Sequence, residues 1–140
     1  MALTHLLDTS VFCQPIKPRP LAPVIQRWEA LGDSALAISV LCQAEVLYGI
    51  ALKNSSRLRE AYEAVLAGRL PVLPVDEAVS QTYAKMRAAL ENSGRRVPDV
   101  DLLIASTAKS HGLILTTLNI RHFSLIPDLA MEDWSLSFTA

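Results

Sequence analysis

Short apolar runs alternate along the chain with longer segments whose apolar residues recur at helical spacing. The short runs predict strands over residues 5–7, 35–39 and 113–115, a half-buried strand over 131–138 from the alternation of Trp134, Leu136 and Phe138 with serines, and at most a short edge strand over 72–75. The first strand runs into a polar turn, Asp8-Thr9-Ser10.

The longer segments predict helices that begin and end at recognisable capping residues. Helices are expected over residues 21–31, 40–52, 55–67 and 76–92, with Ser39 and Asp76 as N-caps and Gly32, Gly68 and Gly94 behind the C-terminal ends. A further helix opens at Pro98-Asp99, is apolar nearly all round over 102–108, and ends at Gly112. The proline cluster at 15, 18, 20 and 23 forbids a long helix in that stretch, which is expected to be a loop.

Strands separated by longer helices indicate an α/β fold in which helices cover both faces of a parallel sheet. The length of 140 residues, with 51% hydrophobic and 19% charged residues, is that of one domain, residues 1–140. A domain of this size can bury enough apolar surface to fold without disulfides or a structural metal.

Charge and cysteine content exclude several classes of protein. The formal net charge of -1 argues against a globally basic nucleic-acid binder, but it leaves room for a local basic rim. Cys13 and Cys42 have neither C-x-x-C spacing nor paired histidines nearby, which favours a reducing, cytoplasmic location. The N-terminal residues do not have the pattern of a signal peptide, and the most apolar tract, 35–52, is interrupted by polar residues, so we expect no membrane span.

Several polar side chains are expected at the carboxyl edge of the predicted sheet, where ligands bind in open parallel sheets. Asp8 follows the first strand, and Thr117 and Asn119 follow the strand at 113–115. Asp8 is also explained as an ordinary turn or cap residue. Glu45 lies within the helix at 40–52, on the edge of its apolar stripe and without a basic neighbour one turn away. This position predicts partial burial, which is costly for an unpaired carboxylate.

Asp99 and Asp101 fall at the start of the apolar helix, where acids are favoured by free N–H groups and the helix dipole. Asp99 fits the N-cap, and Asp101 is then expected to face the carboxyl edge of the sheet. Three carboxylates in one cleft, Asp8, Glu45 and Asp101, would stay ionised only beside a cation. Oxygen ligands of this kind indicate Mg²⁺ or Mn²⁺ rather than zinc.

Four segments in this order and spacing resemble the PIN-domain ribonucleases, and most closely their VapC-type toxins from type II toxin-antitoxin systems. They are residues 6–10 (LLDTS), 43–49 (QAEVLYG), 101–105 (DLLIA) and 117–123, which begins Thr117-Leu118-Asn119. The resemblance covers nearly the whole chain.

The resemblance implies a three-layer PIN sandwich that hydrolyses RNA phosphodiester bonds with Mg²⁺ or Mn²⁺ and a metal-activated water. It implies catalytic roles for Asp8, Glu45, Asp101 and Asn119, of which the three acids hold the metal. Ser10, Thr117 and Asp99 are the supporting residues. It also implies a cognate VapB-type antitoxin and a homodimer. Many PIN domains have an acid where this chain has Asn119, a departure that disfavours a second metal.

Basic residues near these segments are candidates for RNA contacts. Our hypothesis is a rim built from loop residues on either side of the scissile phosphate: Lys17, Arg19, Arg95, Arg96 and Arg121, with His122 as a substrate contact or proton-transfer group.

Two alternatives stay open. One is a catalytically silent PIN-like module that binds RNA or protein, for which Asn119 is the main support. The other is a phospho-receiver domain, but the chain lacks its paired acids after the first strand and its lysine after the last.

Overall fold

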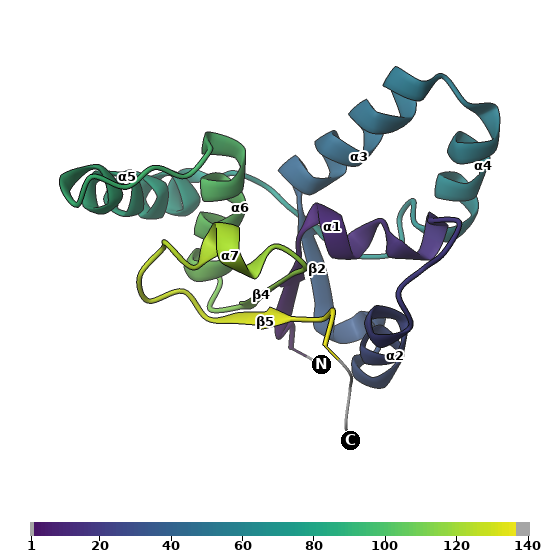
Figure 1. The fold of residues 1–140 in the computed structure, drawn as a ribbon, viewed down its shortest axis with the longest axis horizontal. Coiled ribbons are helices and arrows are strands. Elements are labelled where there is room, and N and C mark those ends of the chain that lie inside the picture. The colour runs from purple at the N-terminus through teal and green to yellow at the C-terminus, as the bar shows by residue number, and fades with distance from the viewer. Residues whose placement is uncertain (1, 137–140) are drawn as a thin grey trace.

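The computed structural model describes residues 2–136 and forms a five-stranded sheet between two layers of helices (Figure 1). The strand order is β3-β2-β1-β4-β5, and every neighbouring pair is parallel. The predicted α/β class and the parallel sheet are therefore confirmed. The strands are β1 (His5–Leu7), β2 (Leu36–Ser39), β3 (Val72–Leu73), β4 (Ile114–Thr117) and β5 (Met131–Asp133).

The long helices lie close to the predicted ranges. They are α2 (Ala22–Leu31), α3 (Val40–Lys53), α4 (Ser56–Val65), α5 (Glu77–Asn92) and α6 (Asp99–Ser110). The predicted N-caps are confirmed, since the side chains of Ser39 and Asp76 accept hydrogen bonds from Leu41 N and Val79 N. Gly94 and Gly112, just beyond α5 and α6, have positive φ angles that few other residues adopt without strain.

Alternate residues along the central strands face two separate hydrophobic cores. Leu7, Leu36 and Ile38 belong to the core beneath α1, α2, α3 and α4, together with Trp28 and Trp134. Leu6, Ala37 and Leu115 belong to the core on the other face, which packs against α5, α6 and α7. Because both faces are covered, the central strands β1 and β2 are buried along their whole length, as expected for a parallel sheet.

The topology brings four chain segments to the carboxyl edge of the sheet. The first helical segments after β1 and β2 start at this edge because they follow the strand ends directly. α6 leads into β4, which is parallel to β1, and so the N-terminus of α6 also lies at the carboxyl edge. β4 ends there as well, beside Asp8, whose N–H donates to the carbonyl of Thr116 at 3.0 Å.

Two short helices were not predicted, and one cap was assigned wrongly. The polar turn after β1 is the start of α1 (Thr9–Phe12), and the residues after Asn119 form α7 (Ile120–Phe123). Asp99 is not the N-cap of α6: Pro98 occupies that position, and Asp99 is the first helical residue. Two 3₁₀ turns, η1 (Gln14–Ile16) and η2 (Asp33–Ala35), complete the elements.

The last predicted strand is shorter than expected. β5 ends at Asp133, and Trp134 turns into the core, where its indole N–H donates to Glu132 at 3.1 Å and its ring lies 6.0 Å from that of His5. Leu136 is exposed, and residues 137 and 138 of the prediction lie outside the described residues. Within residues 2–136, no helix combines the length and apolar character needed to cross a bilayer.

A polar cluster joins the end of α2 to the segment after α4. Asp33 accepts hydrogen bonds from the Trp28 indole at 2.7 Å and from Arg69 Nε at 3.0 Å, and the Arg69 guanidinium lies 4.7 Å from the centroid of the Trp28 ring. Partial burial opposes ionisation of Asp33, but the hydrogen bonds from Arg69 and Trp28 outweigh it and lower the pKa of this carboxyl.

We predict that Asp33→Asn lowers the free energy of unfolding at pH 7 by about 1 kcal/mol, a value reduced by the solvent exposure of the carboxylate. Because the folded-state pKa of Asp33 is depressed, its contribution is present above the unfolded-state pKa and disappears as the pH falls through the folded-state value. Urea unfolding of both proteins from neutral to acid pH measures the difference. If the difference in the free energy of unfolding between wild type and Asp33→Asn does not shrink at low pH, the stabilising role of the ionised Asp33 is contradicted.

Candidate functional site

Asp8 is a buried carboxylate held only by neutral donors. It is 4% exposed. Its Oδ1 accepts from Ser10 Oγ at 2.6 Å and from Val11 N at 3.2 Å, and its Oδ2 accepts from Thr117 Oγ1 at 2.6 Å. It is thus the N-cap of α1 as well as a member of the candidate site. Burial raises the pKa of Asp8, against the opposing effect of these hydrogen bonds, and the nearby charge of Asp101 adds to the rise.

Hydroxyl groups connect Asp8 to the loop after β4. Ser10 Oγ, which donates to Asp8, accepts from Leu118 N at 3.1 Å, and Thr117 Oγ1 accepts from Asn119 N at 2.8 Å. Each hydroxyl therefore links the carboxylate to a backbone N–H of the same loop. This arrangement fixes the loop that carries Asn119 against the start of α1.

Glu45 projects from the second turn of α3 and is exposed, so the expectation of a partly buried glutamate is wrong. Its Oε1 accepts a hydrogen bond from Thr9 Oγ1 at 2.5 Å. At this site, therefore, Asp8 and not Glu45 is the carboxylate whose charge is unfavourable to bury.

Asp101 lies in the first turn of α6 and is paired with a histidine from α7. His122 Nε2 is 3.2 Å from Asp101 Oδ2, with the Asp101 side chain 25% exposed and that of His122 46% exposed. Both residues are candidates from the sequence, but their pairing is not predictable from it, because the contact joins two helices that are separated by β4.

These groups line one cavity of about 180 Å³ at the carboxyl edge of the sheet. Its walls include the three acids, Asn119 and His122, with the remaining positions supplied by Thr9, Ser10, Ile104 and Phe123. Four elements far apart in sequence thus contribute polar side chains to a single space. Asn119 itself is exposed, and its backbone rather than its side chain makes the hydrogen bond to Thr117.

The donor set of the cavity suits a hard divalent cation. All of the acidic and amide groups offer oxygen, and Asp8 is a buried anion without a cationic partner among the described residues. Within residues 2–136, however, no three Asp, Glu, His or Cys side chains stand at the mutual spacing of a preformed metal site. Glu45 and Asp101 are instead turned toward Thr9 and His122, each through a single contact that a cation can replace.

Several of the residues singled out in the sequence, Lys17 and Arg19 among them, do not line this cavity. The Asp99 carboxylate accepts from the Tyr83 hydroxyl at 3.1 Å and lies 3.3 Å from Arg87 NH1. Arg95 and Arg96 line a small separate cavity with Asp99. Of the expected basic rim, Arg121 is near the site, in a shallow cavity that it shares with Asn119 and His122.

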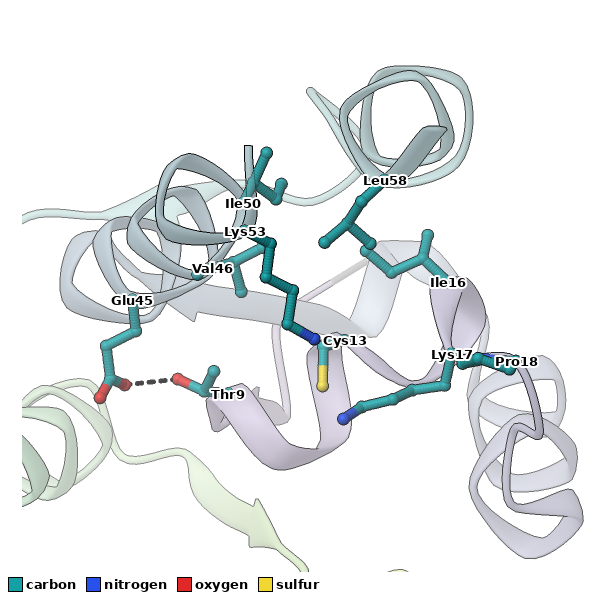
Figure 2. A pocket seen from close by; sticks show the side chains of 11 residues that line it. Thr9, Cys13, Ile16, Lys17, Pro18, Glu45, Val46, Ile50, Lys53 and Leu58 are labelled. Atoms are coloured by element: carbon teal, nitrogen blue, oxygen red, sulfur yellow. Dashed lines mark hydrogen bonds between the residues drawn. The ribbon is translucent and has the colours of Figure 1, made fainter. Parts of the chain in front are cut away.

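A second cavity, of about 190 Å³, adjoins the acidic one, and Thr9 and Glu45 line both. Figure 2 shows Lys17 and Lys53 reaching into it from different elements, with their ammonium groups toward Cys13. Lys53 was missed by the sequence analysis. It lies eight residues after Glu45 on the same helix, and this helical spacing is the signal that could have revealed it.

Comparison with known proteins gives a consistent family match. The family described as PIN domain matches residues 5–128. The tRNA(fMet)-specific endonuclease VapC of Shigella flexneri is 36% identical over 136 residues, covering 95% of this chain and 99% of the relative. Toxin FitB of Neisseria gonorrhoeae is 31% identical over 137 residues, with 92% and 97% covered.

Solved structures show the same fold. The crystal structure of FitAcB from Neisseria gonorrhoeae superposes with a TM-score of 0.85 at 28% identity, covering 94% of this chain and 98% of the other. The structure of VapBC2 from Rickettsia felis, bound to a DNA fragment from their promoter, superposes with a TM-score of 0.81 at 28% identity. The match covers 96% of this chain and 99% of the other. The structure of VapBC-5 from Mycobacterium tuberculosis, a member of the VapBC family of toxin-antitoxin systems, superposes with a TM-score of 0.69 at 31% identity. The match covers 94% of this chain and 96% of the other.

We predict that Thr117→Val destabilises the protein by about 2 kcal/mol, because the buried Asp8 carboxylate loses a donor that valine cannot replace. Thr116→Val is the matched control: Thr116 lies on the same strand and is equally buried, but its hydroxyl donates to a neutral carbonyl, that of Leu6, at 3.3 Å. Thr116→Val should lower the free energy of unfolding by about 1 kcal/mol. Denaturant unfolding measures both, and equal losses would show that Asp8 does not depend on Thr117.

Proposed function

The chain belongs to the PIN-domain family, and from this premise we propose that it is an endoribonuclease toxin that hydrolyses RNA phosphodiester bonds with Mg²⁺ or Mn²⁺. The observation that carries the proposal is the convergence of Asp8, Glu45, Asp101 and Asn119 on one cavity. The names of the relatives, which include endonuclease VapC and Toxin FitB, support the same class of activity.

We assign the metal to Asp8, Glu45 and Asp101. The chemistry that a bound divalent ion supplies there is activation of a water for attack on phosphorus and neutralisation of charge on the phosphate oxygens. Asp8 is the fixed member of the set, because Ser10, Thr117 and Val11 N hold it in place. Glu45 and Asp101 are the adjustable members, since each has one contact to exchange.

Asn119 and His122 face the same cavity and complete the proposed site. Asn119 offers a neutral carbonyl oxygen, so the site carries one negative charge fewer than it would with an acid at that position. This favours a single metal ion. His122 can donate to a substrate phosphate when it is released from Asp101, and Arg121 beside it offers a charge for the RNA backbone.

Asn119 is also the observation that favours a second candidate function, a catalytically silent PIN-like module that binds RNA or protein. The two candidates differ in whether the three acids support cleavage. The experiment below therefore decides between them as well as testing the site.

We further propose that the protein acts in the cytoplasm, with RNA as substrate and a VapB-type antitoxin as partner. The structural neighbours support the partner, because several of them are VapBC assemblies. A short upstream reading frame for a small DNA-binding protein is the genomic arrangement that this proposal expects.

We predict that Asp101→Asn lowers metal-dependent RNA cleavage by at least about a hundredfold, since the site loses one of its three charges toward the cation. Asp99→Asn, an identical change in the same helical turn, should keep the wild-type rate because Asp99 faces Tyr83 and Arg87. Cleavage of structured RNA with added Mg²⁺ or Mn²⁺, and with chelator, measures both variants.

Cleavage that persists in Asp101→Asn or in chelator would contradict the metal-site assignment. Wild-type protein that binds RNA but does not cleave it with either metal would favour the silent module.

An exposed apolar stripe on α3 supports the proposed homodimer. Leu47, Tyr48 and Leu52 are 45%, 66% and 69% exposed, and Val40 and Ala44 continue the stripe at helical spacing toward the sheet. A contiguous apolar face of this kind is uncommon on a monomer and suits a self-complementary contact.

We predict that Leu47→Glu shifts the protein from dimer to monomer, because it places a charge within the stripe. Leu21→Glu is a suitable control, since Leu21 is comparably exposed, at 41%, but precedes α2 and lies off the stripe. Sedimentation velocity over a concentration series reads out the association state. A dimer that survives Leu47→Glu, or a wild-type monomer at all concentrations, would refute this interface.

A further inference from the structure

The cavity beside the acidic site has an apolar floor, and of the residues that line it only Glu45 belongs to the proposed metal site. Its floor is formed by aliphatic side chains from η1, α3 and α4, namely Ile16, Val46, Ile50 and Leu58, with Cys13 beside them (Figure 2). Gly49, which has no side chain, also lines the cavity. We call this cavity the side groove. At about 190 Å³ it is below the roughly 300 Å³ at which pockets for drug-sized molecules begin, so it suits one small ring system.

Two positive charges stand over this apolar floor. Lys17 follows η1 and Lys53 ends α3, and within residues 2–136 neither ammonium group has an ion pair or a hydrogen bond. Lys53 lies at the C-terminus of α3, where the helix dipole favours a positive charge, and this explains a lysine at that position. The helix dipole does not account for a second lysine that approaches the same space from another element, as seen in Figure 2.

The side groove is continuous with the acidic cavity. Thr9 and Glu45 line both spaces, and their hydrogen bond lies at the boundary. An RNA whose scissile phosphate sits in the acidic cavity must place an adjacent nucleotide on an adjoining surface. The side groove offers that nucleotide an apolar floor for the base and free ammonium groups for its phosphate.

We propose that the side groove binds the base of a nucleotide adjacent to the scissile phosphate, with Lys17 and Lys53 on the flanking phosphate, and that it thereby contributes to the choice of cleavage sequence. This inference rests on the proposed ribonuclease function. RNA is favoured over a protein segment because the two free cations match a phosphate backbone and because the groove opens into the proposed cleavage site.

Gly49 provides a test that leaves the surrounding structure intact. A Cβ placed on Gly49 meets no atom within 4 Å, and the residue has ordinary helical backbone within α3. Gly49→Ala therefore adds a methyl group without a clash and is the matched control, and Gly49→Leu places a larger apolar side chain at the same wall of the side groove. Lys53→Met removes one charge while keeping most of the side-chain volume.

The first measurement is binding, in metal-free protein so that cleavage does not enter. Adenosine, guanosine, cytidine and uridine 5′-monophosphates and inorganic phosphate are titrated into ¹⁵N-labelled protein. Nucleotides should shift the amide signal of Gly49 and its neighbours in the wild type and in Gly49→Ala, and should bind about five- to tenfold more weakly to Gly49→Leu. Inorganic phosphate should lose affinity in Lys53→Met.

The second measurement is cleavage of a synthetic random-sequence single-stranded RNA pool, with the cut ends sequenced. Gly49→Leu should weaken the base preference at one position beside the cut, and Gly49→Ala should retain it. Nucleotides that leave Gly49 unshifted, or an unchanged base preference in Gly49→Leu, would overturn the inference while leaving the nuclease intact.

The remaining outcomes separate the two proposals. Nucleotide binding at Gly49 by a protein that cleaves no RNA would support the side groove and reject the nuclease. If Gly49→Leu abolishes binding of a partner protein co-expressed from the neighbouring gene but leaves nucleotide binding unchanged, the side groove belongs to the partner and the RNA assignment is wrong.

Discussion

The buried carboxylate of Asp8 at the end of the central strand is the constraint on which the rest of the site depends. A carboxylate that is 4% exposed must be compensated, and here only neutral hydroxyl and amide donors do so. Those donors come from α1 and from the end of β4, so the same contacts that stabilise the charge also align the two central strands and the loop after them. Because the compensation is only partial, a cation at the proposed site would neutralise a charge that the fold keeps buried.

Glu45 and Asp101 carry the same chemical group as Asp8 but are held by fewer contacts. Glu45 and Asp101 are more accessible, and their partners, Thr9 and His122, belong to the walls of the same cavity. Replacing one hydrogen bond costs little compared with leaving a buried charge unpaired. A site with one fixed and two adjustable carboxylates can therefore gather around an ion without rearranging the fold.

The distribution of charge around the cavity explains how an acidic site could accept an RNA chain. The protein has a formal net charge of -1, so general attraction to RNA is weak, and local groups must provide it. Lys17, Lys53 and Arg121 lie on cavities that share walls with the acidic one, whereas Arg95 and Arg96 surround a different, smaller space. Positive charge beside the acidic cavity thus comes mainly from the residue after η1, from the end of α3 and from α7.

Local sequence determined the strands, the long helices and most of their caps, with Asp99 as the exception, because periodicity and capping depend on neighbours within a few residues. The order of the acidic segments was enough to indicate the family. Sequence did not reveal α1 or α7, each one turn long, since such helices have no periodic pattern and form only where other elements hold them. Tertiary structure alone decided that Glu45 is exposed, that Asp99 faces Tyr83 and Arg87 rather than the cavity, and that His122 pairs with Asp101. These outcomes depend on which helices meet across the sheet, and that is set by packing between residues distant along the chain.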